Sequence, residues 1–162
     1  MFQKYPLLFI LRITVVLFVL SSSFVDADSY QLISNDAVTV GIDSSSCTTN
    51  EISTLLSEAK NLSGGTYSII ATMYFQGSGI HSGWIRLKID DEILGFRWLP
   101  STITNGWQEI TISNYISLAK ASHTVKIEAC SWGTQVVFGA CLEGNCNPGL
   151  GRQVTIVRTS CP

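Results

Sequence analysis

The chain has 162 residues, 46% of them hydrophobic, and its 10 Lys or Arg against 12 Asp or Glu give a formal net charge of −2 at pH 7. This length and apolar content suffice for one domain with a hydrophobic core. The mildly acidic balance argues against nucleic acid or an anionic membrane surface as partner, because both favour basic patches.

The first 27 residues have the anatomy of a secretory signal peptide. Lys4 supplies a short basic region, an apolar run covers residues 7–20, and residues 25–27 (Val-Asp-Ala) match a small-residue cleavage pattern. We expect cleavage after this point, a secreted protein, and a single domain over residues 28–162. An uncleaved membrane anchor is the alternative; a spanning helix needs about 20 apolar residues, and Arg12 interrupts this run.

The rest of the chain alternates apolar and polar residues at period two, which predicts strands with one buried and one wet face. Residues 51–60 alone have helical propensity; we expect an irregular connection with a brief strand there, with a short helix as the alternative. Such half-wet strands are typical of an antiparallel two-sheet β-sandwich, a jelly roll of about 8–10 strands. The expected strands cover residues 31–40 (broken at 35–36), 66–76, 84–90, 93–99, 107–113, 124–129, 136–142 and 153–158.

Two tryptophans fall on faces that are otherwise polar. Trp84 alternates with the inward residues of its strand and shares its outer face with Arg86, and Trp107 shares the polar face of its strand with Glu109. An aromatic ring on a polar face is typical of a sugar-stacking platform or a protein interface. Trp84, Arg86 and Trp107 are therefore the candidate ligand-binding residues, with coverage by a neighbouring loop or strand as the alternative.

Other aromatic side chains are expected to serve the fold. Leu94, Phe96 and Trp98 share one face of their strand and are expected in the core. Trp132 closely follows Cys130 and is expected to pack on a disulfide.

All five cysteines lie beyond the apolar N-terminal segment, which in a secreted chain predicts disulfides. Five cysteines allow two bridges and leave one unpaired or joined to a second chain. A zinc site is disfavoured because no C-x-x-C pair is present. The cysteines are Cys47, Cys130, Cys141, Cys146 and Cys161.

The remaining candidate sites are short. Asn61-Leu62-Ser63 is an N-glycosylation sequon, expected in a loop because Gly64-Gly65 follows. The acidic residues 90–92 (Asp90, Asp91 and Glu92) are weak calcium candidates and are expected to be turn residues. His81 is expected to be an ordinary loop histidine, and His123 a residue at the edge of a strand that hydrogen-bonds the turn.

Two family resemblances accompany these patterns. Over residues 56–159 the order GGTYSIIATMYF, WIRLKIDDEILG, SLAKASHTVKIEA and GRQVTIVRT resembles the jelly-roll domains of the complement-collectin and tumour-necrosis-factor-like superfamily. Asp91-Glu92 stands here in place of the usual Asp-Gly, and Ala121 in place of the usual Gly. Over residues 64–129 the order LPSTITNGWQEI and ISLAKASHTVKI is similar to galactose-binding-like carbohydrate-binding modules.

These observations predict a secreted, non-catalytic recognition module that binds a glycan or an extracellular protein and needs no cofactor. The alternative is a structural protein that self-associates, as a trimer for example, which the first resemblance and the odd cysteine favour. A hydrolase ranks third, because neither G-x-S-x-G nor H-E-x-x-H occurs in the chain.

Overall fold

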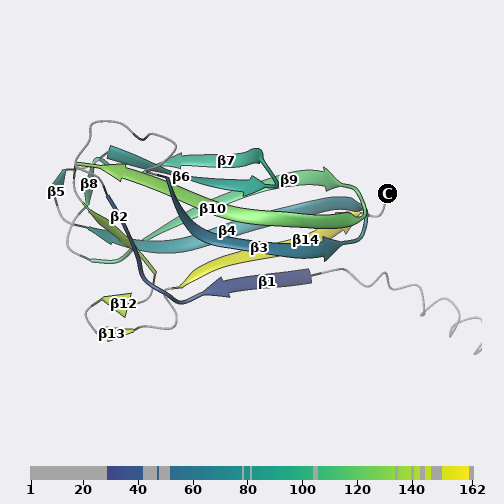
Figure 1. The fold of residues 1–162 in the computed structure, drawn as a ribbon, viewed down its shortest axis with the longest axis horizontal. Helices are drawn as coiled ribbons and strands as arrows, with labels where there is room; N and C mark the ends of the chain where they lie inside the picture. The colour runs from purple at the N-terminus through teal and green to yellow at the C-terminus, as the bar shows by residue number, and fades with distance from the viewer. Residues whose placement is uncertain are drawn as a thin grey trace, which may run out of the picture.

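A computed structural model describes residues 29–41, 47, 52–77, 79–80, 82–103, 106–133, 135–139, 141–142, 145–146 and 151–160, with the backbone alone described at 79–80, 102–103, 141–142 and 145–146. The expected signal peptide, His81 and Cys161 lie outside these residues. The described chain is all-β and forms two antiparallel sheets (Figure 1). Within it, no helix is long and apolar enough to cross a membrane.

Six strands form the first sheet, and the long strand β4 organises it. One side of β4 pairs with β14 along residues 66–72 and with β11 along residues 75–77, and its other side pairs with β9. The strands follow the order β1 (Ser29–Ser34), β14 (Arg152–Ser160), β4 (Gly65–Gly77), β11 (Val136–Phe138) and β2 (Val38–Val40), with β9 (Gln108–Leu118) on β4.

The second sheet is four-stranded, and two short ladders lie outside both sheets. The order of the second sheet is β3 (Ser53–Leu62), β10 (Ala121–Trp132), β6 (Ser82–Ile89) and β7 (Glu92–Trp98). The short ladders pair β5 (Gly79–Ile80) with β8 (Thr102–Ile103), and β12 (Cys141–Leu142) with β13 (Asn145–Cys146). The predicted two-sheet jelly-roll sandwich is confirmed, and the predicted strand at residues 136–142 is divided into β11 and β12.

The core lies between the facing sides of the two sheets, as the period-two pattern predicted. Alternate residues of β4 from Tyr67 to Phe75 are at most 1% exposed, and Ile85 and Leu87 of β6 and Ile127 of β10 are fully buried. Burial of such side chains stabilises the fold by about 1.5–3 kcal/mol each.

The expected irregular connection over residues 51–60 is wrong, because β3 runs through most of it. Leu56 pairs with Ile127 and Thr54 with Glu128, so Leu55 is an extra residue in the ladder, a β-bulge. Leu55 and Leu56 are both buried as a result. Two successive buried residues interrupt the alternation by which a strand is recognised in a sequence.

A buried arginine joins three strands of the first sheet at one end. Arg152 is 2% exposed; its Nη1 donates to the carbonyl oxygen of Phe138 at 3.2 Å and its Nη2 to Oγ of Ser34 at 2.6 Å. Burial lowers the pKa of Arg152, and the nearby carboxylate of Asp36 opposes this shift. The contacts tie β14 to β11 and β1.

Candidate functional site: an aromatic cluster on an outer face

Four aromatic side chains gather on the side of the four-stranded sheet that faces away from the core. Trp84 of β6 lies opposite Trp98 of β7 in the register, and Trp132 ends β10. Ring centroids are 5.9 Å apart between Trp84 and Phe96, 5.1 Å between Phe96 and Trp98, and 6.4 Å between Trp98 and Trp132. We call these four residues the outer aromatic cluster.

Exposure within the cluster is uneven. Trp98 is 65% and Phe96 40% exposed, whereas Trp84 and Trp132 are half-buried. Contiguous exposed aromatic surface of this kind is uncommon on a monomer unless it serves contact with a ligand or partner. Trp98 is thus the ring most available to a ligand.

The expectation that Phe96 and Trp98 belong to the core is wrong. Leu87 pairs with Gly95 and Lys88 with Ile93, so Leu94 is an extra residue in the ladder. A one-residue shift turns every following side chain to the other face of the sheet. Leu94 therefore enters the core at 8% exposure, while Phe96 and Trp98 turn outward.

A charged network borders the cluster and fixes Arg86. The guanidinium carbon of Arg86 lies 4.8 Å from the ring centroid of Trp84, and its Nε donates to Oε2 of Glu128 at 2.6 Å. Nζ of Lys88 lies 3.6 Å from the other carboxylate oxygen of Glu128. A cation over an indole face is attracted to it by about 0.5–2 kcal/mol. Arg86 thus presents a rigid polar edge next to the aromatic rings.

A disulfide links Cys47 to β10 next to the outer aromatic cluster. Cys47 and Cys130 are bonded with 6.2 Å between their Cα atoms, and Cys130 is fully buried directly opposite Trp84 in the ladder. The bridge fits an oxidising compartment. Trp132 packs against Trp98. The backbones of Cys141 and Cys146 lie opposite each other in the β12–β13 ladder.

Trp107, the third candidate binding residue, belongs to a different surface. It is half-buried and directly precedes β9, a strand of the six-stranded sheet. Tyr74 and Glu109 lie on the outer side of that sheet, and the Tyr74 hydroxyl donates to the Glu109 carboxylate at 2.7 Å. The structure therefore brings Trp84 and Arg86 together and leaves Trp107 on the other sheet.

The acidic turn is tied to the start of β10. Oδ1 of Asp90 accepts the backbone N–H of Thr124 at 2.8 Å, and Oδ2 lies 3.0 Å from Nδ1 of His123. The other ring nitrogen of His123 lies 3.0 Å from the carbonyl oxygen of Ala119. Both partners accept hydrogen bonds, so the doubly protonated imidazolium satisfies both. Asp90 and Asp91 form the predicted turn, whereas Glu92 begins β7, and His123 hydrogen-bonds the turn as expected.

These contacts shift both pKa values in the direction that favours the ion pair. The hydrogen bonds to Asp90 and Ala119 raise the pKa of His123, although burial opposes the rise. The Thr124 N–H and then His123 lower the pKa of Asp90.

Asp91 is exposed and lies 3.9 Å from Nζ of Lys88. Within the described residues, no group of three or more His, Cys, Asp or Glu could hold a metal ion.

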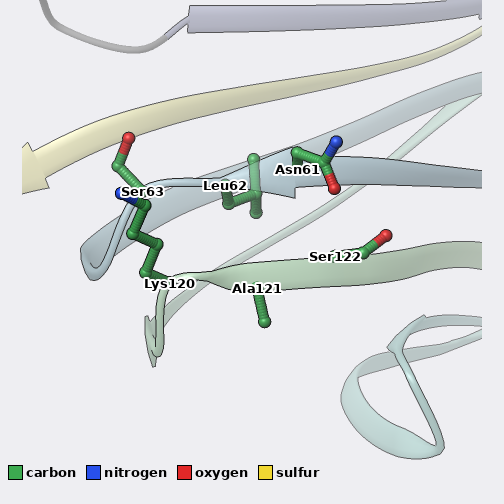
Figure 2. A pocket seen from close by; sticks show the side chains of 6 residues that line it. All are labelled: Asn61, Leu62, Ser63, Lys120, Ala121 and Ser122. Carbon is green, nitrogen blue, oxygen red and sulfur yellow. The ribbon is translucent and has the colours of Figure 1, made fainter.

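The sequon asparagine lies at a shallow pocket of about 350 Å³ at the other end of the same sheet. Figure 2 shows the lining from the end of β3 and the start of β10, with Asn61 near Ser122, its partner in the ladder. Asn61 is exposed, but it belongs to β3; the expected loop begins only at Ser63. Trp132 lies ten positions beyond Ser122 along β10, roughly 33 Å away at the usual rise.

Comparisons with known proteins find similar solved structures but no similar sequence. No protein-family model matches the chain, and no curated protein sequence does. Eiger TNF from S. frugiperda is 11% identical, covering 62% of each chain with a TM-score of 0.37. The infectious bursal disease virus VP2 subviral particle is 16% identical over 84% of this chain and 38% of that one, with a TM-score of 0.46.

A third similar structure contains the CBM22-1 and GH10 modules of Clostridium thermocellum endo-1,4-beta-D-xylanase 10B, 16% identical over 82% of this chain and 26% of that one, with a TM-score of 0.40. The chain thus spans less than two thirds of each of these three structures. Structures of the two expected kinds, a tumour necrosis factor and one that contains a carbohydrate-binding module, are thus among those that match. At these identities the likeness assigns no ligand.

Proposed function

We propose that this chain is a secreted, non-catalytic recognition module that binds a glycan on the outer aromatic cluster. The observation that carries the proposal is the continuous set of ring contacts from Trp84 to Trp132, with Trp98 65% exposed. The C–H faces of a sugar ring are apolar and stack on aromatic rings, while its hydroxyl groups require polar partners at the edge. Arg86 and Glu128 stand at that edge.

Secretion is supported by the apolar N-terminal segment and by the Cys47–Cys130 bridge, since disulfides persist in oxidising compartments. The non-catalytic part rests on the commitment of His123 and Asp90 to the turn, where both are held by backbone groups as well as by each other. A glycan attached to Asn61 would sit at the far end of the sheet and leave the cluster uncovered.

A glycan array probed with the purified secreted domain tests the proposal. We expect a set of related oligosaccharides to bind, and Trp98→Ala to weaken binding about 30-fold, as loss of a central aromatic anchor does. Ile93→Ala on the same sheet removes an exposed apolar side chain outside the ring contacts and is the matched control. If no glycan on the array binds and an extracellular protein binds to the same cluster, the glycan proposal is wrong and the ligand is a protein.

A further inference from the structure

The outer side of the six-stranded sheet has a composition unlike that of the four-stranded sheet. The register places one residue from each of β1, β14, β4 and β9 side by side in rows across the sheet. Rows that face the core alternate with rows that face outward, and the row through Leu32, Val154, Ala71 and Ile112 is buried in the core. The central outward row consists of Gln31, Thr155, Ile70 and Ser113.

The two outward rows on either side of the central row are equally free of charge. One row consists of Ile33, Gln153, Thr72 and Thr111. The other consists of Ser29, Val157, Ser68 and Tyr115. Ile33, Ile70 and Tyr115 are 54%, 40% and 68% exposed. We call these three rows the uncharged face; by contrast, the outer side of the other sheet carries Arg86, Lys88 and Glu128.

We propose that the uncharged face is an interface between copies of this chain. When a surface meets the same surface of a second copy about a two-fold axis, a residue near the axis meets its own copy, so a charge at the centre of the surface would face a like charge. A face without charges avoids that repulsion, and its Ser, Thr and Gln side chains supply donors and acceptors that pair with themselves. Exposed Ile70, at the centre, and Tyr115, at the rim, supply apolar contact.

The size of the sheet agrees with a stable contact. The strands β1, β14, β4 and β9 hold six, nine, 13 and 11 residues. At about 3.3 Å per residue and 4.8 Å between strands, the whole outer side of these strands covers roughly 600 Å² in flat projection, and the uncharged face takes up roughly 300 Å² in its middle. Tyr74 and Glu109 lie in the next outward row, beyond Thr72 and Thr111. Side-chain relief increases the accessible area of the whole outer side towards the roughly 800 Å² that each partner buries in a standard interface, so a contact of that size extends beyond the uncharged face.

The proposal is tested by light scattering on the purified secreted domain over a range of concentrations. We expect an oligomer with a dissociation constant in the micromolar range or tighter. Ile70→Glu should raise that constant at least about 100-fold, because it buries like charges that have no partner. Thr155→Lys, next to it in the central row, should act in the same way. Ile93→Glu changes an exposed isoleucine on the other sheet and should leave the oligomer intact.

A wild-type chain that stays monomeric at every concentration would overturn the proposal, and so would an oligomer that Ile93→Glu weakens as much as Ile70→Glu does. Circular dichroism shows whether each variant keeps the sheet structure. Since this face and the outer aromatic cluster lie on different sheets, Ile70→Glu should retain glycan binding. The failure of one proposal is therefore distinguishable from the failure of the other.

Discussion

The Cys47–Cys130 bridge should contribute a large part of the stability of the fold. It closes a loop with a sequence separation of 83 residues. A chain-entropy calculation for a loop of this length gives about 4–5 kcal/mol, lost when the bridge is absent, because the unfolded chain then regains its conformational freedom. The free energy of unfolding of domains of this size is about 5–15 kcal/mol. Removing the bridge should therefore cost about a quarter or more of the free energy of unfolding.

Urea denaturation of wild type, Cys47→Ala and the double variant with Cys130→Ala measures this cost. Cys47→Ala breaks the bridge and leaves the fully buried Cys130 side chain in place, so its loss reports the bridge itself. The double variant adds a small cavity opposite Trp84 and should lose slightly more. If Cys47→Ala unfolds at the same urea concentration as wild type, with an unchanged slope, the entropic reasoning is refuted.

Three further predictions concern the turn, the bulge and the sequon. The pKa of His123 is raised in the folded state, so this group stabilises the fold below pH 6.5, its ordinary pKa, and the contribution is lost as pH rises through the raised pKa. The pKa of Asp90 is lowered in the folded state, so this group stabilises the fold above pH 3.8, its ordinary pKa, and the contribution is lost as pH falls through the lowered pKa. Thermal unfolding should show both contributions complete between about pH 4 and 6.5, and His123→Asn should remove the loss above pH 6.5. A methyl group added by Gly95→Ala would overlap Cγ2 of Ile112 and should lower the free energy of unfolding in urea by about 1–3 kcal/mol. When Gly95→Ala is combined with Ile112→Ala, the total loss should be smaller than the sum of the two single losses. Losses that simply add would contradict the contact. Expression in a eukaryotic secretory host should give a glycan mass that Asn61→Gln removes without changing glycan binding, and a wild-type mass without glycan would refute modification.

The sequence was sufficient for the regular parts of the fold and insufficient at its irregularities. Period-two alternation identified the inward residues of β4, β6 and β10 correctly, because each of those strands keeps its phase. Leu55 and Leu94 are bulge residues, and each makes its strand deviate from that phase. A bulge depends on the partner strand as well as on its own sequence, so alternation within one segment does not reveal it.

The candidate site shows the same division. Trp84 and Arg86 were found because β6 alternates regularly through both residues. Unbroken alternation through Leu94 predicts that Trp98 lies in the core, because it does not include the bulge there. Its assignment could have been questioned from one signal: Gly95 follows Leu94, and a glycine inside a strand often marks a bulge or a close backbone approach. The separation of Trp107 from Trp84 follows from strand order, which local patterns do not encode.

The central claim is that Trp98 anchors a glycan on the outer aromatic cluster. Calorimetric titration of the best-binding soluble oligosaccharide tests it most directly when Trp98→Ala is compared with Tyr115→Ala, since these rings are 65% and 68% exposed on opposite outer faces. The account predicts about 30-fold weaker binding for Trp98→Ala and unchanged binding for Tyr115→Ala. Equal affinities for wild type and Trp98→Ala would contradict it.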